Sequence, residues 1–165
     1  MSDEPLRVIS NRPEHLLLAS PRLFVSIHDG PTTLASVAAE SNYAKKKMGT
    51  TPSSVGCLVI LGANTPPPEP EVRAVLPKLL DDIAPASAGL AMVIEGAGFR
   101  AAVLRAIFSG VLALKRLPYR ASVFDTSRPA LDWLATRVAI DAAARDADLV
   151  RLRREHGLHP EGPLA

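Results

Sequence analysis

The sequence predicts an α/β fold: a mixed, mostly parallel sheet of about five strands, with an N-terminal hairpin and four helices packed on it. Continuous apolar runs at residues 55–61 and 90–94 have the length and two-sided apolarity of interior strands. The segments between and after them repeat apolar residues at helical spacing, so strands and helices alternate. Strands joined through helices lie parallel in one sheet, which gives the fold class.

The N-terminal part is expected to form a hairpin followed by a helix. A Ser-Pro turn joins the apolar segment 15–18 to the alternating segment 23–28, a pattern typical of two paired strands. Apolar residues then recur at helical spacing over 32–48, where Thr32 or Thr33 is available as the N-cap.

The remaining elements alternate in the same way. They are a helix over about 69–83, a helix over 98–117, a strand over 120–124 and a helix that begins after residue 127. We expect residues 1–140 to form a single domain. Residues 141–165 are predicted to be an Arg-rich helical extension with a flexible C-terminal tail.

Composition excludes several classes of protein. The 165 residues are 47% hydrophobic and 22% charged, which fits one globular domain and neither a disordered chain nor a coiled coil. With Cys57 as the single cysteine, no intrachain disulfide can form. The formal net charge of +2 is too small to predict a nucleic-acid partner.

The chain is expected to be cytoplasmic. The first residues carry acidic side chains and no apolar run of signal-peptide length. The longest apolar stretch, residues 101–114, is too short to cross a bilayer, so no transmembrane segment is predicted.

Segment 119–134 reads YRASVFDTSRPALDWL, a short strand ending in Phe that passes through a capped turn into a helix. This segment and the order of elements resemble the SpoIIAA-like STAS domain family, in its standalone STAS/SEC14-like form, over residues 6–138. The resemblance implies a regulatory or ligand-sensing module with no chemistry of its own. STAS regulators carry an Asp-Ser pair between a buried strand and the next helix, and a partner kinase phosphorylates its Ser. The matching junction 62–67 lacks this pair, and its only hydroxyl is that of Thr65. This departure argues against a phosphorylation switch of that type.

The sharpest local pattern lies between an apolar strand and a helix. Gly96, Gly98 and Ala101 match the G-x-G-x-x-G/A fingerprint of dinucleotide-binding loops. The candidate ligand-binding residues are Gly96, Gly98, Phe99 and Arg100. Only one strand and one helix of the domain follow this unit. They are too few to complete one mononucleotide-binding half of a dinucleotide-binding fold. We therefore prefer a tight strand-to-helix turn with Phe99 packed inward, and nucleotide binding is the alternative.

The helix over 99–117 is apolar on nearly every side. Such a helix is either fully buried or has a partner for its second face. The candidate contact residues are Phe108, Val111 and Leu112, which we expect to meet a second copy of the chain or a hydrophobic small molecule. Simple core packing explains the pattern equally well.

The remaining polar residues predict neither a catalytic set nor a metal site. No metal-ligand spacing relates the four histidines, His15, His28, His156 and His159, except in the tail pair His156 and His159, which lies in the segment predicted to be flexible. No cofactor is expected. We therefore predict a non-enzymatic regulatory or protein-protein interaction module, acting as a homodimer. The alternative is a small-ligand binding protein, for a lipid-like molecule against the helix over 99–117 or for a nucleotide at 96–100.

Overall fold

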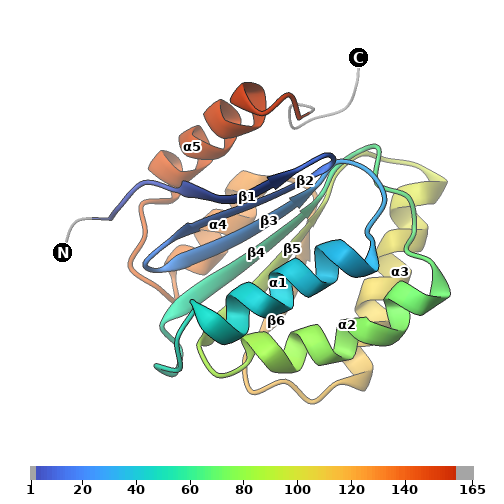
Figure 1. The fold of residues 1–165 in the computed structure, drawn as a ribbon, viewed down its shortest axis with the longest axis horizontal. Coiled ribbons are helices and arrows are strands. Elements are labelled where there is room, and N and C mark those ends of the chain that lie inside the picture. Colours follow the sequence, from blue (N-terminus) through green and yellow to red (C-terminus); the bar gives the residue numbers. More distant parts are fainter. Residues whose placement is uncertain (1–2, 159–165) are drawn as a thin grey trace.

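A six-stranded sheet forms the centre of the described part of the chain, residues 3–158, in the computed structural model. Its strands lie side by side in the order of the sequence (Figure 1). They are β1 (Arg7–Arg12), β2 (His15–Ser20), β3 (Leu23–His28), β4 (Val55–Leu61), β5 (Ser87–Ile94) and β6 (Ala121–Phe124). The first three are antiparallel neighbours, whereas β3 to β6 are parallel. The α/β class is thus confirmed.

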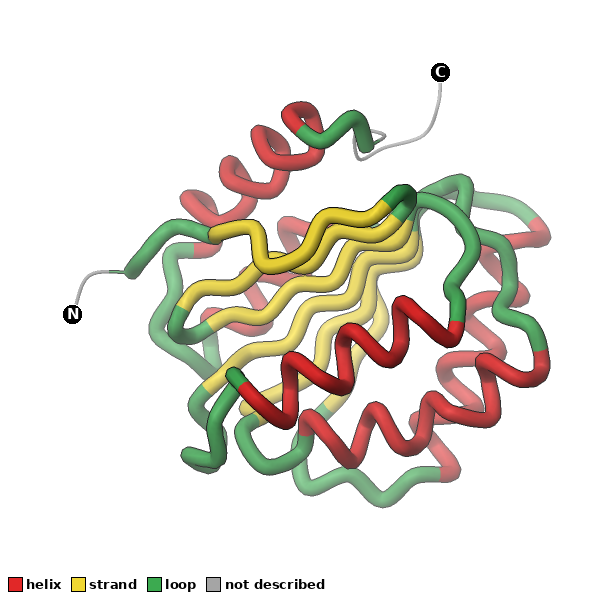
Figure 2. The backbone as a smooth tube through the Cα atoms, in the orientation of Figure 1, coloured by secondary structure: helices red, strands yellow, loops and turns green. Residues whose placement is uncertain are grey.

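Helices cover both faces of this sheet (Figure 2). They are α1 (Leu34–Lys46), α2 (Pro70–Ile83), α3 (Phe99–Leu114), α4 (Ser127–Ala135) and α5 (Ala142–Glu155). Helices α1, α2 and α3 connect successive parallel strands. Because such connections share one hand and always step to the next strand, these three helices lie on one face.

The sheet therefore has two separate cores. We call the side covered by α1, α2 and α3 the first face; its core includes Phe24, Cys57 and Leu104. The side covered by α4 and α5 is the second face, where Leu58, Leu131 and others pack. Successive residues of each interior strand alternate between the two cores, as the pleat of a strand requires.

The sheet contains one strand more than predicted. Strand β1 lies at the edge, and most of its residues are exposed. It pairs with β2 through a register that shifts between Val8 and Ser10. An exposed, irregular edge strand has no alternation of buried residues, so the hydrophobic pattern does not reveal it.

A fifth helix belongs to the packed body. Leu149 and Leu152 of α5 are buried in the core of the second face, and Arg145 and Arg153 are buried as well. The boundary predicted at residue 140 therefore does not separate this helix from the fold. Residues 159–165, the end of the predicted tail, lie outside the described residues.

The predicted helix over 32–48 is confirmed as α1, and its start is well defined. Thr33 is the N-cap, and its hydroxyl accepts a hydrogen bond from the backbone N–H of Ser36 at 3.1 Å. The Ser36 hydroxyl in turn accepts one from the backbone N–H of Thr33 at 2.9 Å. This reciprocal capping box fixes where the helix begins. Among the described residues, none of the helices has both the length and the apolarity needed to cross a membrane.

Candidate functional site

A buried polar cluster lies on the first face, formed by His15 on β2, Ser26 and His28 on β3, and Glu40 on α1. The hairpin register places His15 directly opposite His28. Ser26 precedes His28 by two residues and so points to the same face of the sheet. Glu40 lies on the buried side of α1, with Val37 and Ala44. We call these four residues the His-Glu cluster.

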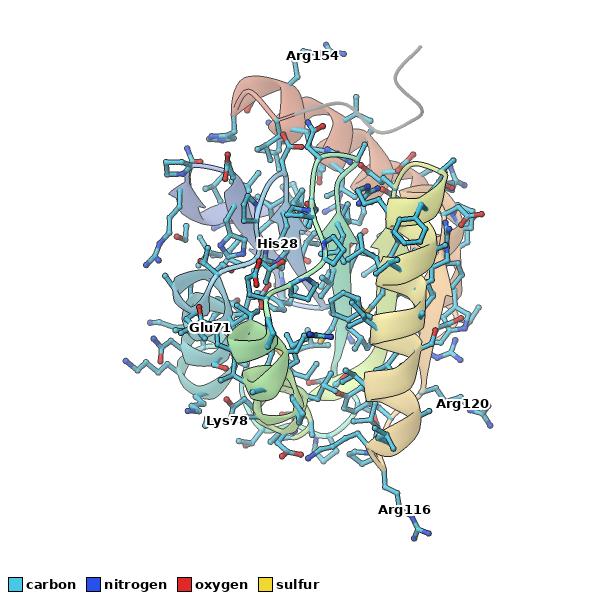
Figure 3. The ribbon with its side chains drawn as sticks, turned by 90° about the vertical axis from the view of Figure 1, so that its right-hand side faces the viewer. His28, Glu71, Lys78, Arg116, Arg120 and Arg154 are labelled. Carbon is cyan, nitrogen blue, oxygen red and sulfur yellow. The ribbon has the colours of Figure 1, made fainter. Side chains whose placement is uncertain are left out.

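The four side chains of the His-Glu cluster are in direct contact. His28 Nε2 is 2.8 Å from Glu40 Oε1, and His15 Nε2 is 3.0 Å from Ser26 Oγ. The Ser26 hydroxyl donates a hydrogen bond to Glu40 Oε1 and lies 3.2 Å from His28 Nε2. The two imidazole rings stack, with 4.5 Å between their centroids. Figure 3 shows His28 inside the molecule, whereas Lys78, Arg116 and Arg154 project from its surface.

Burial and hydrogen bonding set the charges of the cluster. Burial raises the pKa of Glu40, but the attraction of His28 and the hydrogen bonds from both histidines outweigh it. The net result lowers this pKa from 4.5 to about 2. Burial lowers the pKa of His15, and its hydrogen bond to Glu40 offsets only part of that effect. At neutral pH the cluster therefore holds an ionised carboxylate beside a neutral His15.

The arrangement is unlike a serine-histidine-carboxylate triad. In a triad the carboxylate binds one ring nitrogen and the serine the other, so that the imidazole passes a proton between them. Here Ser26 and Glu40 both approach the Nε2 atom of His28. The Nδ1 atoms of His15 and His28 have no hydrogen-bond partner among the described residues. The polar atoms of the cluster thus converge on one another, and they do not form a relay from serine through imidazole to carboxylate.

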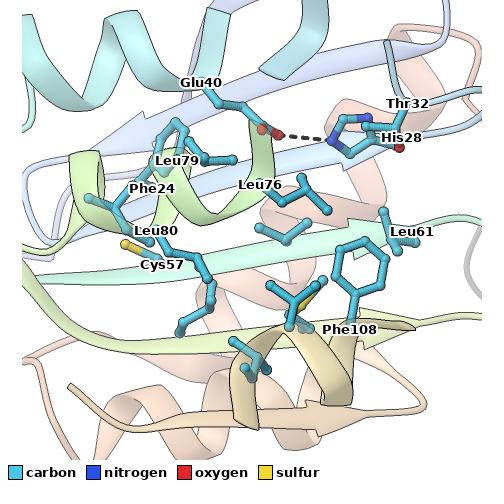
Figure 4. Close-up of a pocket in the computed structure, with 16 residues that line it drawn as sticks. Phe24, His28, Thr32, Glu40, Cys57, Leu61, Leu76, Leu79, Leu80 and Phe108 are labelled. Carbon is cyan, nitrogen blue, oxygen red and sulfur yellow. Dashed lines mark hydrogen bonds and ion pairs between the residues drawn. The ribbon is translucent and has the colours of Figure 1, made fainter. Parts of the chain in front are cut away.

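An apolar cavity of about 60 Å³ adjoins the cluster, between the sheet and helices α1, α2 and α3 (Figure 4). His28, Glu40 and Thr32 form its polar part. Its apolar walls are Phe24, Cys57, Val59, Leu61, Leu76, Leu79, Leu80, Ile83, Leu90, Met92, Phe108, Val111 and Leu112. Burial raises the pKa of the Cys57 thiol to about 12, so this wall residue is uncharged at neutral pH.

The main chain at His28 is held by the loop after β4. The His28 carbonyl accepts hydrogen bonds from the Gly62 N–H at 2.7 Å and from the Thr65 hydroxyl at 2.9 Å. Arg100 donates to the Thr65 carbonyl at 2.6 Å and to the Glu95 carbonyl. Thr65, the hydroxyl considered for phosphorylation, is fully buried. Its side chain therefore positions His28.

The predicted ligand loop is a tight turn between β5 and α3. Gly96 and Gly98 have φ angles of 86° and 84°, in the left-handed region that favours glycine. Phe99 is 86% exposed, so the expectation that it packs inward is wrong. Phe99 is the first residue of α3, and its side chain lies on the side of this helix that faces away from the sheet. Arg100 lies against Gly96 and donates to the carbonyls of Thr65 and Glu95, so its guanidinium holds the turn together.

The three predicted contact residues of α3 lie against the cavity. Phe108 is buried, and Val111 and Leu112 are half-buried. Phe108 is therefore not available to a second copy of the chain in this conformation, because it packs into the core of the first face. All three residues do lie where a hydrophobic molecule in the cavity would contact them.

A second pair of buried charges lies on the other side of the sheet. Arg153 of α5 forms a two-point ion pair with Glu95, which follows β5, at 2.5 and 2.9 Å. Both side chains are 2% exposed. This pair ties α5 to the sheet through two charge-assisted hydrogen bonds, so we assign it a structural role.

No protein-family model, curated protein or solved structure matches the chain. Linear spacing misses the His-Glu cluster because hairpin pairing brings the two histidines together. The sequence does contain one signal. If residues 20 and 23 pair across the hairpin turn, the same register places His15 opposite His28.

Proposed function

We propose that this protein binds a small hydrophobic molecule in the cavity of the first face. The observation that carries the proposal is an apolar cavity lined by residues whose buried polar atoms have no hydrogen-bond partner within residues 3–158. Concave, mostly apolar sites with a few convergent polar groups are the usual form of small-molecule binding sites. This is the small-ligand alternative of the sequence analysis, with its hydrophobic contacts on α3.

The polar end of the cavity defines the head group of the ligand. The Thr32 hydroxyl oxygen and His28 Nδ1 are buried without a hydrogen-bond partner among the described residues. Both belong to residues that line the cavity. Buried polar atoms are nearly always paired, so a ligand or solvent group is expected to pair with them. Because Glu40 is ionised, a neutral or cationic group fits better here than a carboxylate.

The size of the cavity limits the part of the ligand that is enclosed. A volume of about 60 Å³ corresponds to roughly four to six water-sized spheres. We therefore expect the polar head and a short hydrocarbon segment to be enclosed. The apolar side chains of Leu79 and Leu112 would contact that segment.

A six-carbon series with different head groups tests this function. Hexanol, hexylamine and hexanoate should be titrated into the chelator-treated protein while its leucine and valine methyl resonances are followed by NMR. We expect hexanol and hexylamine to shift the cavity methyls, and hexanoate to bind at least about tenfold more weakly because of Glu40. Absence of saturable shifts with all three compounds would overturn the proposal.

Two leucines of α3 provide a matched pair of variants. Leu112→Trp places a larger side chain at the cavity wall, whereas Leu114→Trp makes the same change at a residue that is 91% exposed. We expect Leu112→Trp to weaken hexanol binding at least about tenfold and Leu114→Trp to leave it within about twofold. Thermal unfolding of both variants checks that they fold. Equal effects of the two changes would show that hexanol binds elsewhere.

A second candidate function is the regulatory, protein-binding role that the resemblance to STAS domains implies, with the chain acting as a homodimer. The outward side of α3 supports it, because its exposed positions carry no charge. They are Phe99, Ala102, Ala106, Ser109, Gly110, Ala113 and Leu114. An exposed helix face without charges favours contact with another protein surface.

The mass of the protein across a wide concentration range tests this second role. We expect the apparent mass to rise with concentration toward that of a dimer, and Ala106→Glu to keep the chain monomeric. A monomer at every concentration would exclude the homodimer and leave ligand binding unaffected.

A further inference from the structure

Four donor atoms of the His-Glu cluster converge on one small volume. They are Nε2 of His15, Nε2 of His28, Oε1 of Glu40 and Oγ of Ser26. Ser26 Oγ is 3.0 Å from His15 Nε2, and it also contacts the donor atoms of His28 and Glu40. One ligand atom from each histidine and one from Glu40 all lie within 4.8 Å of one another. The four residues come from two strands and one helix, so the folded backbone fixes their positions.

The separations fit a shared metal ion. Donor atoms bound to one tetrahedral zinc ion at about 2.0–2.2 Å lie roughly 3.2–3.6 Å apart. His15 Nε2 is 3.6 Å from Glu40 Oε1, and His28 Nε2 is 2.8 Å from the same oxygen. Small side-chain movements would therefore bring the donors to the separations that coordination requires.

The chemistry of the donor set selects the class of ion. Two imidazoles and one carboxylate form the three-ligand set of many zinc sites, with the fourth position open or held by a weak ligand. Mg²⁺ and Ca²⁺ favour six or more oxygen ligands, which this cluster does not offer. Imidazole nitrogen instead suits Zn²⁺ and the neighbouring transition metals. The Ser26 hydroxyl is placed to act as the weak fourth donor.

Charge and access are also suitable. Among the described residues, the ion pairs of Glu40 are those with His15 and His28, and its side chain is 4% exposed. Neither of these pairs contains Lys or Arg. A buried carboxylate without such a partner favours a divalent cation as its counter-charge. His28 and Glu40 also line the cavity, so an ion in the cavity would lie beside the cluster.

We propose that His15, His28 and Glu40 bind a zinc-class divalent transition metal ion, with Ser26 Oγ as a displaceable fourth donor. This inference does not depend on a hydrophobic ligand. The competing arrangement is a metal-free network in which both Nε2 atoms carry protons and Ser26 donates to Glu40. The two arrangements differ in histidine tautomer, because metal binding through Nε2 leaves the proton on Nδ1.

Titration of the chelator-treated protein with Zn²⁺ against a chromophoric chelator tests the proposal. We expect one ion per chain and no binding of Mg²⁺ at the same concentration. The variants His15→Gln, His28→Gln and Glu40→Gln should each weaken Zn²⁺ binding at least about 100-fold, because each removes a ligand. His156→Gln, the same change in a half-buried histidine outside the cluster, should leave the affinity within about twofold.

Two measurements on the unaltered protein keep the test valid if a cluster variant fails to fold. Imidazole nitrogen NMR should show His15 and His28 protonated at Nδ1 once Zn²⁺ is added. Co²⁺ should give the intense visible absorption of four-coordinate cobalt. Retention of Nε2–H on both rings, six-coordinate cobalt, failure to bind one Zn²⁺, or equal loss in His156→Gln would each overturn the proposal.

Discussion

The two faces of the sheet both bury charged groups, but they do so in different ways. On the second face, Glu95 and Arg153 satisfy each other through two short contacts. On the first face, Glu40 is held by neutral and weakly basic groups, and two ring nitrogens and the Thr32 hydroxyl are unpaired among the described residues. Burial of a charged group therefore does not by itself mark a functional site. Buried polar atoms left without a partner beside it do.

The largest effect is expected on the second face. Replacing Arg153 by Met leaves Glu95 as an unpaired buried charge and should lower the free energy of unfolding by about 3–5 kcal/mol. The double variant Glu95→Leu with Arg153→Met removes both charges and should recover most of that loss. Urea denaturation measures both. A loss below about 1 kcal/mol in the single variant would contradict a structural role for the pair.

Leucine truncation compares the packing of the two faces. Leu131 is fully buried on the second face, and Leu131→Ala should cost about 3 kcal/mol of unfolding free energy. Leu76 lines the cavity, so its side chain makes fewer packing contacts than one enclosed on all sides. Leu76→Ala should therefore lower the free energy of unfolding by only about 1–2 kcal/mol. Urea denaturation of both variants tests the difference. Equal losses would mean that the first face is as tightly packed as the second.

A smaller gain is expected from filling the cavity. Val59→Ile adds one methylene at the cavity wall and keeps the β-branch that suits strand β4. The free energy of unfolding should rise by about 0.5–1 kcal/mol, while hexanol binding weakens. Thermal unfolding and the methyl titration described above measure the two effects. Destabilisation would indicate that the cavity does not have the room assigned to it.

The last prediction changes no side chain. Burial raises the pKa of Cys57 to about 12, so at pH 8 almost none of it is the reactive thiolate in the folded protein. Iodoacetamide should therefore label native Cys57 slower than the urea-unfolded chain by roughly three orders of magnitude. Labelling should accelerate as the pH rises toward 12, provided the fold persists. Equal native and unfolded rates at pH 8 would contradict this environment.

The central fold could be predicted because local pattern and tertiary environment agree there. The apolar run at 55–61 is strand β4, and the capped helical pattern over 32–48 is α1. Helix α5 was harder to place, because its buried side mixes Leu149 and Leu152 with two arginines. Paired arginines can be buried, but they interrupt the apolar stripe by which a packed helix is identified.

The candidate site could be predicted only in part. The apolar excess of α3 predicts contact residues, and these residues line the cavity in the structure. The cavity itself depends on how closely three helices approach the sheet, which no sequence period specifies. The pairing of His15 with His28 follows from the hairpin turn. Glu40, although on the apolar side of α1, has no feature in the sequence that separates it from a solvated glutamate.

The two borders of the sheet limit how copies of this chain can meet. Strand β1 has a register shift between Val8 and Ser10, which interrupts the straight row of backbone amides along this edge. Its first and last residues, Arg7 and Arg12, are charged. At the opposite border, β6 has only four residues. Neither border offers a long, flat template onto which a foreign strand could add. Edge-to-edge pairing of sheets from successive copies is therefore disfavoured, and contact between molecules is directed to the helical surfaces.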